Sequence, residues 1–252
     1  MNKQHTSKPH TPRQPGFTLV EMAMVLTIVG LLLGALIPTL SAQIELQRVT
    51  ETRKQLNEIQ QALIGYAIIN GRLPCPASAT ATEDPVGGGV CNHAYDGFIP
   101  AATLGLSTTD SSGFAVDSWG NRIRYAVTPW PSTNPTNTFT TASGLASTGI
   151  SNLAQAGTPY LQVCSAASTN TSSCTANTAL TAKPGVPVVI YSTGKNGVGS
   201  GLDERENTDN DQVFTSHTPT PSTATNGEFD DLVIWLSANN LVSRMIAAGK
   251  LP

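Results

Sequence analysis

The sequence predicts an α+β protein in which one long N-terminal helix packs on a small antiparallel sheet. Two observations support this class. Residues 17–70 form an apolar run that passes directly into an amphipathic one. After residue 120, short strand-like runs bounded by Gly, Pro and Ser recur. The 252 residues are enough for one good-sized domain or two small ones.

The predicted helix begins in a run with a single charge. Residues 17–40 read FTLVEMAMVLTIVGLLLGALIPTL, and Glu21 is their one charged side chain. A helix of this length reaches about 36 Å, which exceeds a hydrocarbon core of about 30 Å. An ordinary secretory signal usually has a shorter apolar core, and the nearby cleavage candidate "LSAQ" has the bulky Leu40 where a small residue is preferred. We therefore predict a leader at 1–16 and a transmembrane segment at 17–40.

The amphipathic half of the helix is predicted over residues 41–70, which contain no Gly or Pro until Gly65. Spacings of seven, three and four place six residues on one helical face. These residues are Val49, Leu56, Ile59, Leu63, Tyr66 and Asn70. The whole helix, from Phe17 to Asn70, would be about 80 Å long, and Pro38 is expected to bend it.

The remainder, residues 71–252, is predicted to be a globular domain. Its strand-like runs are 121–128, 159–164, 186–192 and 230–237. Alternation in the first run puts Ile123, Tyr125 and Val127 on one face, opposite Arg122 and Arg124. Residues 131–157 and 165–185 are rich in Thr, Ser, Asn and Ala and read as long loops. Ser237 is placed to cap a last helix that ends at Gly249.

The chain contains four cysteines, at positions 75, 91, 164 and 174. None forms a CxxC pair, so the spacing does not favour zinc. An even number in an exported chain favours two disulfides. Three pairings are possible, and we favour the local ones, Cys75–Cys91 and Cys164–Cys174. The alternative is four buried free thiols.

The N-terminal segment resembles that of type IV pilins and of the pseudopilins of type II secretion. The residues that carry the resemblance are a short basic leader, Gly16, Phe17, "TLVE", an apolar helix with Pro38 and an amphipathic continuation. The resemblance covers roughly residues 13–70 and implies a pilin-like fold. It further implies that a prepilin peptidase cuts between Gly16 and Phe17 and methylates the new amine of Phe17. The string "DSWGNRIRYAV" also resembles the sheet entry of major pseudopilins.

The position of Glu21 has a physical explanation within this resemblance. An acid at bilayer depth costs about 2.5–3.5 kcal/mol, so it needs a partner. Cleavage creates one, since the amine of Phe17 is cationic. The carboxylate of an incoming subunit would meet the amine of its neighbour and set how deep the subunit sits, although desolvation offsets much of the attraction. The alternative is a glutamate near the interface that reaches water.

The acidic stretch GLDERENTDNDQVF, residues 201–214, supplies many hard oxygens in one predicted loop. Calcium takes six to eight such ligands. The stretch is not an EF-hand, because Gln212 replaces the required Gly. With the preceding "STGKNGVGSG", however, it resembles the loop in which major pseudopilins hold calcium. The resemblance makes calcium a candidate cofactor; if it binds, Asp203, Asp209 and Asp211 are the first choices as ligands. The alternative is a solvated acidic turn.

Composition and motifs exclude several other functions. The net charge is −3, and the first 16 residues carry three basic side chains and no acid, so the body is acidic. Nucleic-acid binding favours a basic surface, and no such binding is evident here. The "GKNGVGSG" run does not match a phosphate loop, because Asn196 follows its lysine. There is no Gly-x-Ser-x-Gly nucleophile elbow, so no catalytic residue is assigned.

These observations predict a structural subunit, not an enzyme. It would be a minor pilin or a pseudopilin that partners with prepilin peptidase, with other pilin or pseudopilin subunits and with the inner membrane. The chain would cross the bacterial inner membrane once, with its globular domain in the periplasm, and would later join a pilus or pseudopilus. The extended Thr/Ser loops favour a minor subunit. The alternative is a tethered periplasmic enzyme or calcium-binding module that uses the helix only as an anchor.

Overall fold

The computed structural model describes residues 16–128, 139–146, 160–183 and 185–251, apart from the side chains of residues 34–40. The chain divides into two compact units, residues 1–47 and 48–252. The predicted loop 131–157 lies largely outside the described residues.

Helix α1 (Leu19–Asn70) starts in the first unit and continues into the second. It is 52 residues long and includes Pro38, so one unbroken helix over the apolar and amphipathic runs is confirmed. In the first unit the large apolar side chains described between Phe17 and Leu33 are all at least 43% exposed. Within the described part of the chain, the helices contain no stretch that is both long and apolar enough to span a membrane. The transmembrane segment at 17–40 therefore stays a prediction.

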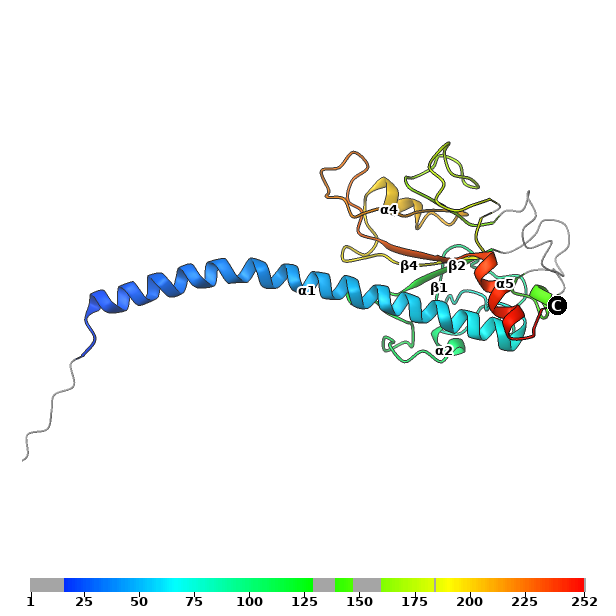
Figure 1. The fold of residues 1–252 in the computed structure, drawn as a ribbon, viewed down its shortest axis with the longest axis horizontal. Helices are drawn as coiled ribbons and strands as arrows, with labels where there is room; N and C mark the ends of the chain where they lie inside the picture. The colour runs from blue at the N-terminus through cyan, green and yellow to red at the C-terminus, as the bar shows by residue number, and fades with distance from the viewer. Residues whose placement is uncertain (1–15, 129–138, 147–159, 184, 252) are drawn as a thin grey trace, which may run out of the picture. The chain divides into compact units, whose positions relative to one another are not determined.

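In the second unit, the last turns of α1 pack on a four-stranded antiparallel sheet. The strands are β1 (Gly97–Phe98), β2 (Arg124–Val127), β4 (Val188–Ser192) and β6 (Leu232–Leu236), in the order β1-β2-β4-β6. Helix α1 contributes Leu56, Ile59 and Leu63 to the core, each at most 2% exposed. They belong to the same hydrophobic core as Ile123, just before β2, and Tyr125 of β2. Figure 1 shows the second half of α1 along one face of this sheet and α4 on the other side. The predicted α+β class and the predicted inward face of 121–128 are confirmed.

A second, smaller sheet was not predicted. Strand β3 (Gln162–Cys164) pairs in parallel with β5 (Val213–Thr215), so the sheet structure is not purely antiparallel. Leu161, Val163 and Phe214 pack with Val189 and Tyr191 on the face of β4 that looks away from α1. The predicted run 159–164 therefore contains a strand over Gln162–Cys164, and this strand belongs to the outer layer; residue 159 lies outside the described residues.

Among the described residues, the domain also contains the short helices α2 (Ala101–Leu104), α4 (Leu202–Glu206) and α5 (Ala238–Ala247). Helix α5 confirms the predicted last helix, since the Ser237 hydroxyl accepts the backbone N–H of Asn240 at 3.3 Å. Gly249 follows with φ +67°, the left-handed conformation expected where a helix stops. Helix α4 falls inside the acidic stretch that the sequence predicted to be a loop.

The turn after α1 is held by a disulfide and a buried ion pair. Both predicted disulfides are present, Cys75–Cys91 and Cys164–Cys174, and no cysteine of the described chain is free. Arg72 and Glu83 form two parallel contacts of 2.7 Å, with side chains 8% and 5% exposed. Burial, the largest single effect, raises the pKa of Glu83. The hydrogen bonds and charge of Arg72, with backbone N–H groups of Gly87 and Cys75, together outweigh burial, so the pKa is lowered.

Candidate functional site

The peptide bond expected to be cleaved lies in an accessible place. Gly16, Phe17 and Thr18 precede the first helical residue, Leu19, and have no regular structure. Phe17 is 76% exposed, and no heavy atom lies within 4 Å of a Cβ built on Gly16. A peptidase can reach an exposed, uncrowded bond of this kind. Cleavage and methylation there stay predictions.

Glu21 has a local role that the sequence reading missed. Its carboxylate accepts the backbone N–H of Thr18 at 3.0 Å and the Thr18 hydroxyl at 2.9 Å, while the N–H of Glu21 donates to that hydroxyl at 3.3 Å. This reciprocal arrangement is a capping box, which satisfies donors that a helix start otherwise leaves free. The spacing T-x-x-E was visible in "GFTLVE" and could have revealed it. In the single chain, Glu21 is therefore already hydrogen-bonded.

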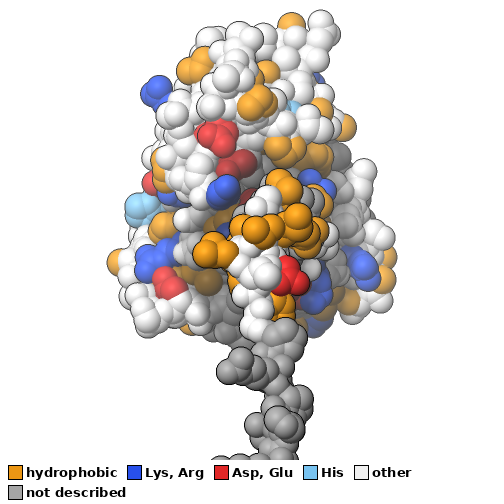
Figure 2. Space-filling view, turned by 90° about the vertical axis from the view of Figure 1, so that its left-hand side faces the viewer, with side chains coloured by type: hydrophobic (Ala, Val, Ile, Leu, Met, Phe, Trp, Pro, Cys, Tyr) orange, Lys and Arg blue, Asp and Glu red, His pale blue; other side chains and the backbone are white. Residues whose placement is uncertain are grey.

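The start of α1 carries apolar side chains that no described residue buries. Figure 2 shows hydrophobic side chains gathered near this end of the helix, with an acidic side chain among them. A continuous exposed apolar surface on a single chain normally marks contact with a membrane or with another protein.

The predicted calcium ligands are only partly brought together. Asp209 and Asp211 lie with Glu206 in one group, and Asp203 lies outside that group. The carboxylate of Asp203 is already used: it accepts the N–H of Ala167 at 2.6 Å and contacts the side chains of His217 and Asn226. In the described structure the three predicted ligands therefore do not lie in one group, and calcium binding by them stays a prediction.

The Glu206 group faces a pocket between α4 and the loop after β3, with a volume of 370 Å³. Burial raises the pKa of Glu206 to about 7 and that of Asp211 to about 6. The Glu206 carboxyl group also has a structural contact, since its Oε1 accepts the backbone N–H of Ser168 at 3.1 Å.

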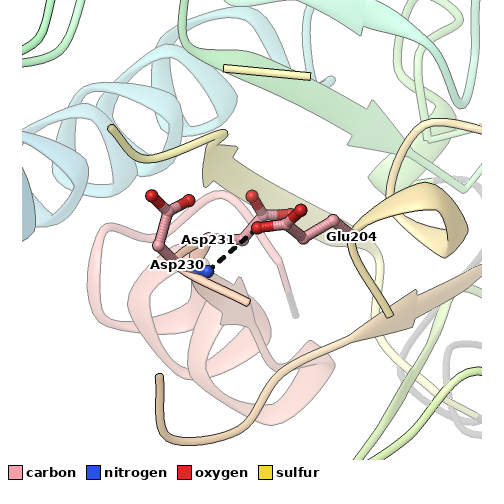
Figure 3. Close-up of side chains that lie close together, drawn as sticks. All are labelled: Glu204, Asp230 and Asp231. Atoms are coloured by element: carbon pink, nitrogen blue, oxygen red, sulfur yellow. Dashed lines mark hydrogen bonds between the residues drawn. The ribbon is translucent and has the colours of Figure 1, made fainter. Parts of the chain in front are cut away.

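A second acidic group, the cation triad, consists of Glu204, Asp230 and Asp231. One carboxylate oxygen of each lies within 4.8 Å of the others, and Glu204 and Asp231 are only 2% and 4% exposed. Figure 3 shows Glu204 reaching from α4 toward the two aspartates that precede β6. The dashed bond joins the N–H of Asp230 to Glu204 Oε1 at 3.1 Å.

Each member of the cation triad leaves one buried oxygen without a hydrogen-bond partner. These atoms are Glu204 Oε2, Asp230 Oδ1 and Asp231 Oδ1. Burial raises the pKa of Asp231 to about 8 and that of Asp230 to about 6, because no described group compensates their charge fully. Calcium binds oxygens at 2.3–2.6 Å, so two ligands of one ion lie up to about 5 Å apart. The spacing and the chemistry of the triad therefore fit a hard divalent cation.

The Gly-rich loop before α4 brings its backbone close to the carboxylates of the triad. A Cβ on Gly199 would lie 1.5 Å from Glu204 Oε2. Gly194 has φ +62°, and a Cβ there would lie 2.2 Å from Asp230 Oδ1. Only glycine permits this approach of the backbone to the carboxylates. The glycines of "STGKNGVGSG" therefore have a steric role.

Asn207 connects the triad to the outer sheet. Its amide nitrogen donates to Asp231 Oδ2 at 2.7 Å, and its amide oxygen accepts the N–H of Thr215 at 2.7 Å. Glu204 and Asn207 lie within the acidic stretch 201–214, whereas Asp230 and Asp231 were predicted only as the start of the strand-like run 230–237. Two adjacent acids at the entry of the apolar run "LVIWL" were the signal that could have revealed the site.

Comparison with known proteins identifies the N-terminal segment. Residues 11–37 match the family model of the prokaryotic N-terminal methylation motif. This segment is characteristic of the precursors of type IV pilins and pseudopilins, so the predicted resemblance is confirmed for this part of the chain. No curated protein and no solved structure matches the chain. Precursors with this motif are typically processed by a prepilin peptidase and associated with the cell envelope, and the motif is typical of structural subunits.

Proposed function

We propose that this chain is a minor pilin or pseudopilin, a structural subunit cut between Gly16 and Phe17, methylated at Phe17 and built into a filament through α1. The observation that carries the proposal is the methylation motif at residues 11–37. The motif overlaps the first part of α1, and the apolar side chains described there are exposed in the single chain. Lipid before assembly, and neighbouring helices after it, would cover that surface.

Mass spectrometry of the N-terminus of the protein purified from its own cells tests the processing. The expected terminus is N-methylated Phe17. A terminus at Met1 would contradict the proposal and would favour a protein that uses the helix only as an anchor. A terminus after Leu40 or beyond would instead indicate an ordinary cleaved signal.

In the assembled filament, Glu21 would pair with the amine of Phe17 from the neighbouring subunit and set the register. Two variants separate this role from capping. Gln at this position still forms a capping box but carries no charge, whereas Ala removes both. We expect Glu21→Gln and Glu21→Ala to insert into membranes like the parent chain and to lose incorporation into filaments. Normal incorporation of Glu21→Gln would leave capping as the role of Glu21.

The second part of the proposal is a structural calcium ion in the cation triad, in place of the set Asp203, Asp209 and Asp211. Glu204, Asp230 and Asp231 would supply carboxylate oxygens, and the ion would link α4 to the start of β6. Calorimetric titration of the full chain in detergent with Ca²⁺ provides the test. Asp231→Asn should abolish binding, while the double variant Asp209→Ala/Asp211→Ala should retain it. The reverse result would restore the set predicted from the sequence.

A further inference from the structure

The Cys164–Cys174 disulfide closes a short loop that lies against α4. The two cysteines are separated by 10 positions in the sequence. Inside the loop, the Ser168 hydroxyl donates to the carbonyl of Ser173 at 2.8 Å, so the loop is also bonded to itself. A cross-link of this kind restricts the conformations of the segment that it closes.

The loop holds α4 through two backbone N–H groups. Ala167 donates to Asp203 Oδ1 at 2.6 Å, and Ser168 donates to Glu206 Oε1 at 3.1 Å. The two acceptors are 5% and 7% exposed and lie on either side of Glu204 in the chain. Both acceptors are carboxyl oxygens, and a bond to a carboxyl group in its ionised form is stronger than a bond between neutral groups. The position of Glu204 in the cation triad therefore depends on the loop.

A second connection runs from the disulfide to Asp231. Cys164 is the last residue of β3 and pairs with Thr215 of β5. Thr215 is held by Asn207, which donates to Asp231 Oδ2. The loop that begins at Cys164 is thus linked to two of the three carboxylates by separate sets of hydrogen bonds.

We propose that the disulfide loop 164–174 is a positioning element of the cation triad, and that the triad holds a divalent cation tightly only when the Cys164–Cys174 bond is formed. The inference rests on the proposed cation site. Opening the loop frees Ala167 and Ser168, so α4 loses the two donors that fix it on either side of Glu204. Residues that hold metal ligands in place typically contribute about 10- to 100-fold to metal affinity.

Titration of the full chain in detergent with Ca²⁺ measures this contribution. The test variant is Cys164→Ser/Cys174→Ser, and the control is Cys75→Ser/Cys91→Ser, since no described contact joins that disulfide to α4. We expect the test variant to bind Ca²⁺ about 10- to 100-fold more weakly and the control to bind like the parent chain. Equal affinity of test variant and parent would overturn the proposal.

A second pair of variants keeps both disulfides intact. Ala167→Pro removes the N–H that binds Asp203, whereas Ala166→Pro removes an N–H for which the described residues show no partner. Only Ala167→Pro should weaken Ca²⁺ binding. Equal affinity of the two proline variants would contradict the assigned role of the Ala167 donor, even if the cysteine variant fails to fold.

Hydrogen exchange in chelator separates the positioning role from the cation site. Opening the disulfide should speed exchange of the α4 amides without any cation present. If the parent chain does not bind Ca²⁺, the proposed cation site fails, and the exchange result alone decides whether the loop positions α4. Unchanged α4 exchange in Cys164→Ser/Cys174→Ser would refute that role.

Discussion

Replacing Glu204 by Gln is the sharpest test of the cation triad, because its effect should depend on calcium. Gln keeps the size of the side chain and removes one charge. Its amide nitrogen can donate to the neighbouring carboxylates, Asp230 and Asp231, which have buried oxygens without partners. In chelator the substitution should therefore stabilise the protein.

The size of the effect follows from the geometry. The carboxylate oxygens lie within 4.8 Å of one another, and two ionised oxygens at that separation repel each other by about 3 kcal/mol at an effective dielectric constant of about 20. Glu204→Gln should raise the free energy of unfolding in chelator by about that amount at a pH above the pKa of Asp231, about 8. Calcium at a hundredfold excess over its dissociation constant would add about 3 kcal/mol to the parent chain and nothing to the variant. The difference between the two chains should then nearly vanish.

Urea unfolding followed by far-ultraviolet circular dichroism measures these free energies in chelator and in calcium. Glu58→Gln is the control, because Glu58 is 65% exposed and pairs with Lys54 at 3.8 Å on the surface of α1. Its free energy of unfolding should change by about 1 kcal/mol at most in either condition. If Glu204→Gln shifts stability equally with and without calcium, the three carboxylates do not share an ion.

Three further predictions concern stability. Glu83→Gln leaves a buried arginine without its full counter-charge and should lower the free energy of unfolding in urea by about 3–5 kcal/mol. The control Glu58→Gln should lower it by about 1 kcal/mol or less, and similar losses in the two variants would refute the role of the ion pair. Ser237→Ala should cost about 1 kcal/mol by removing the cap of α5, whereas the exposed Ser243→Ala should change stability by about 0.5 kcal/mol at most; equal thermal shifts would contradict the cap. Burial raises the pKa of Asp231 to about 8, so ionisation opposes folding, and the free energy of unfolding in chelator should fall as pH rises from the ordinary carboxyl range through 8. A flat profile in that window would oppose this assignment.

The elements that the sequence predicted well are those with a strong local pattern. The face of α1 that contains Leu56, Ile59 and Leu63 could be read from spacing, because packing of that face follows the period of the helix. The cap at Ser237 and both disulfides were also accessible, since each depends on residues that are close in the chain.

The candidate site was only half predictable, because it depends on contacts between distant segments. Glu204 and Asp231 are 27 positions apart in the printed sequence, and no periodicity shows that their carboxylates meet. The composition of residues 201–214 indicated a cation, but tertiary contacts decide which acids keep a free oxygen. The carboxylate of Asp203, for example, accepts a backbone N–H from another loop, at Ala167.

The parallel pairing of β3 with β5 also affects the order of folding. Every residue from 165 to 212 lies between the two strands in the chain, and β4, which joins the other sheet, is among them. Contacts between distant segments form slowly, because a long loop must close before they become favourable. We expect α1 and the central strands to become ordered first and the acidic region to become ordered late. Rapid-mixing exchange experiments would then show protection of Val213–Thr215 as one of the last steps on the route to the native state.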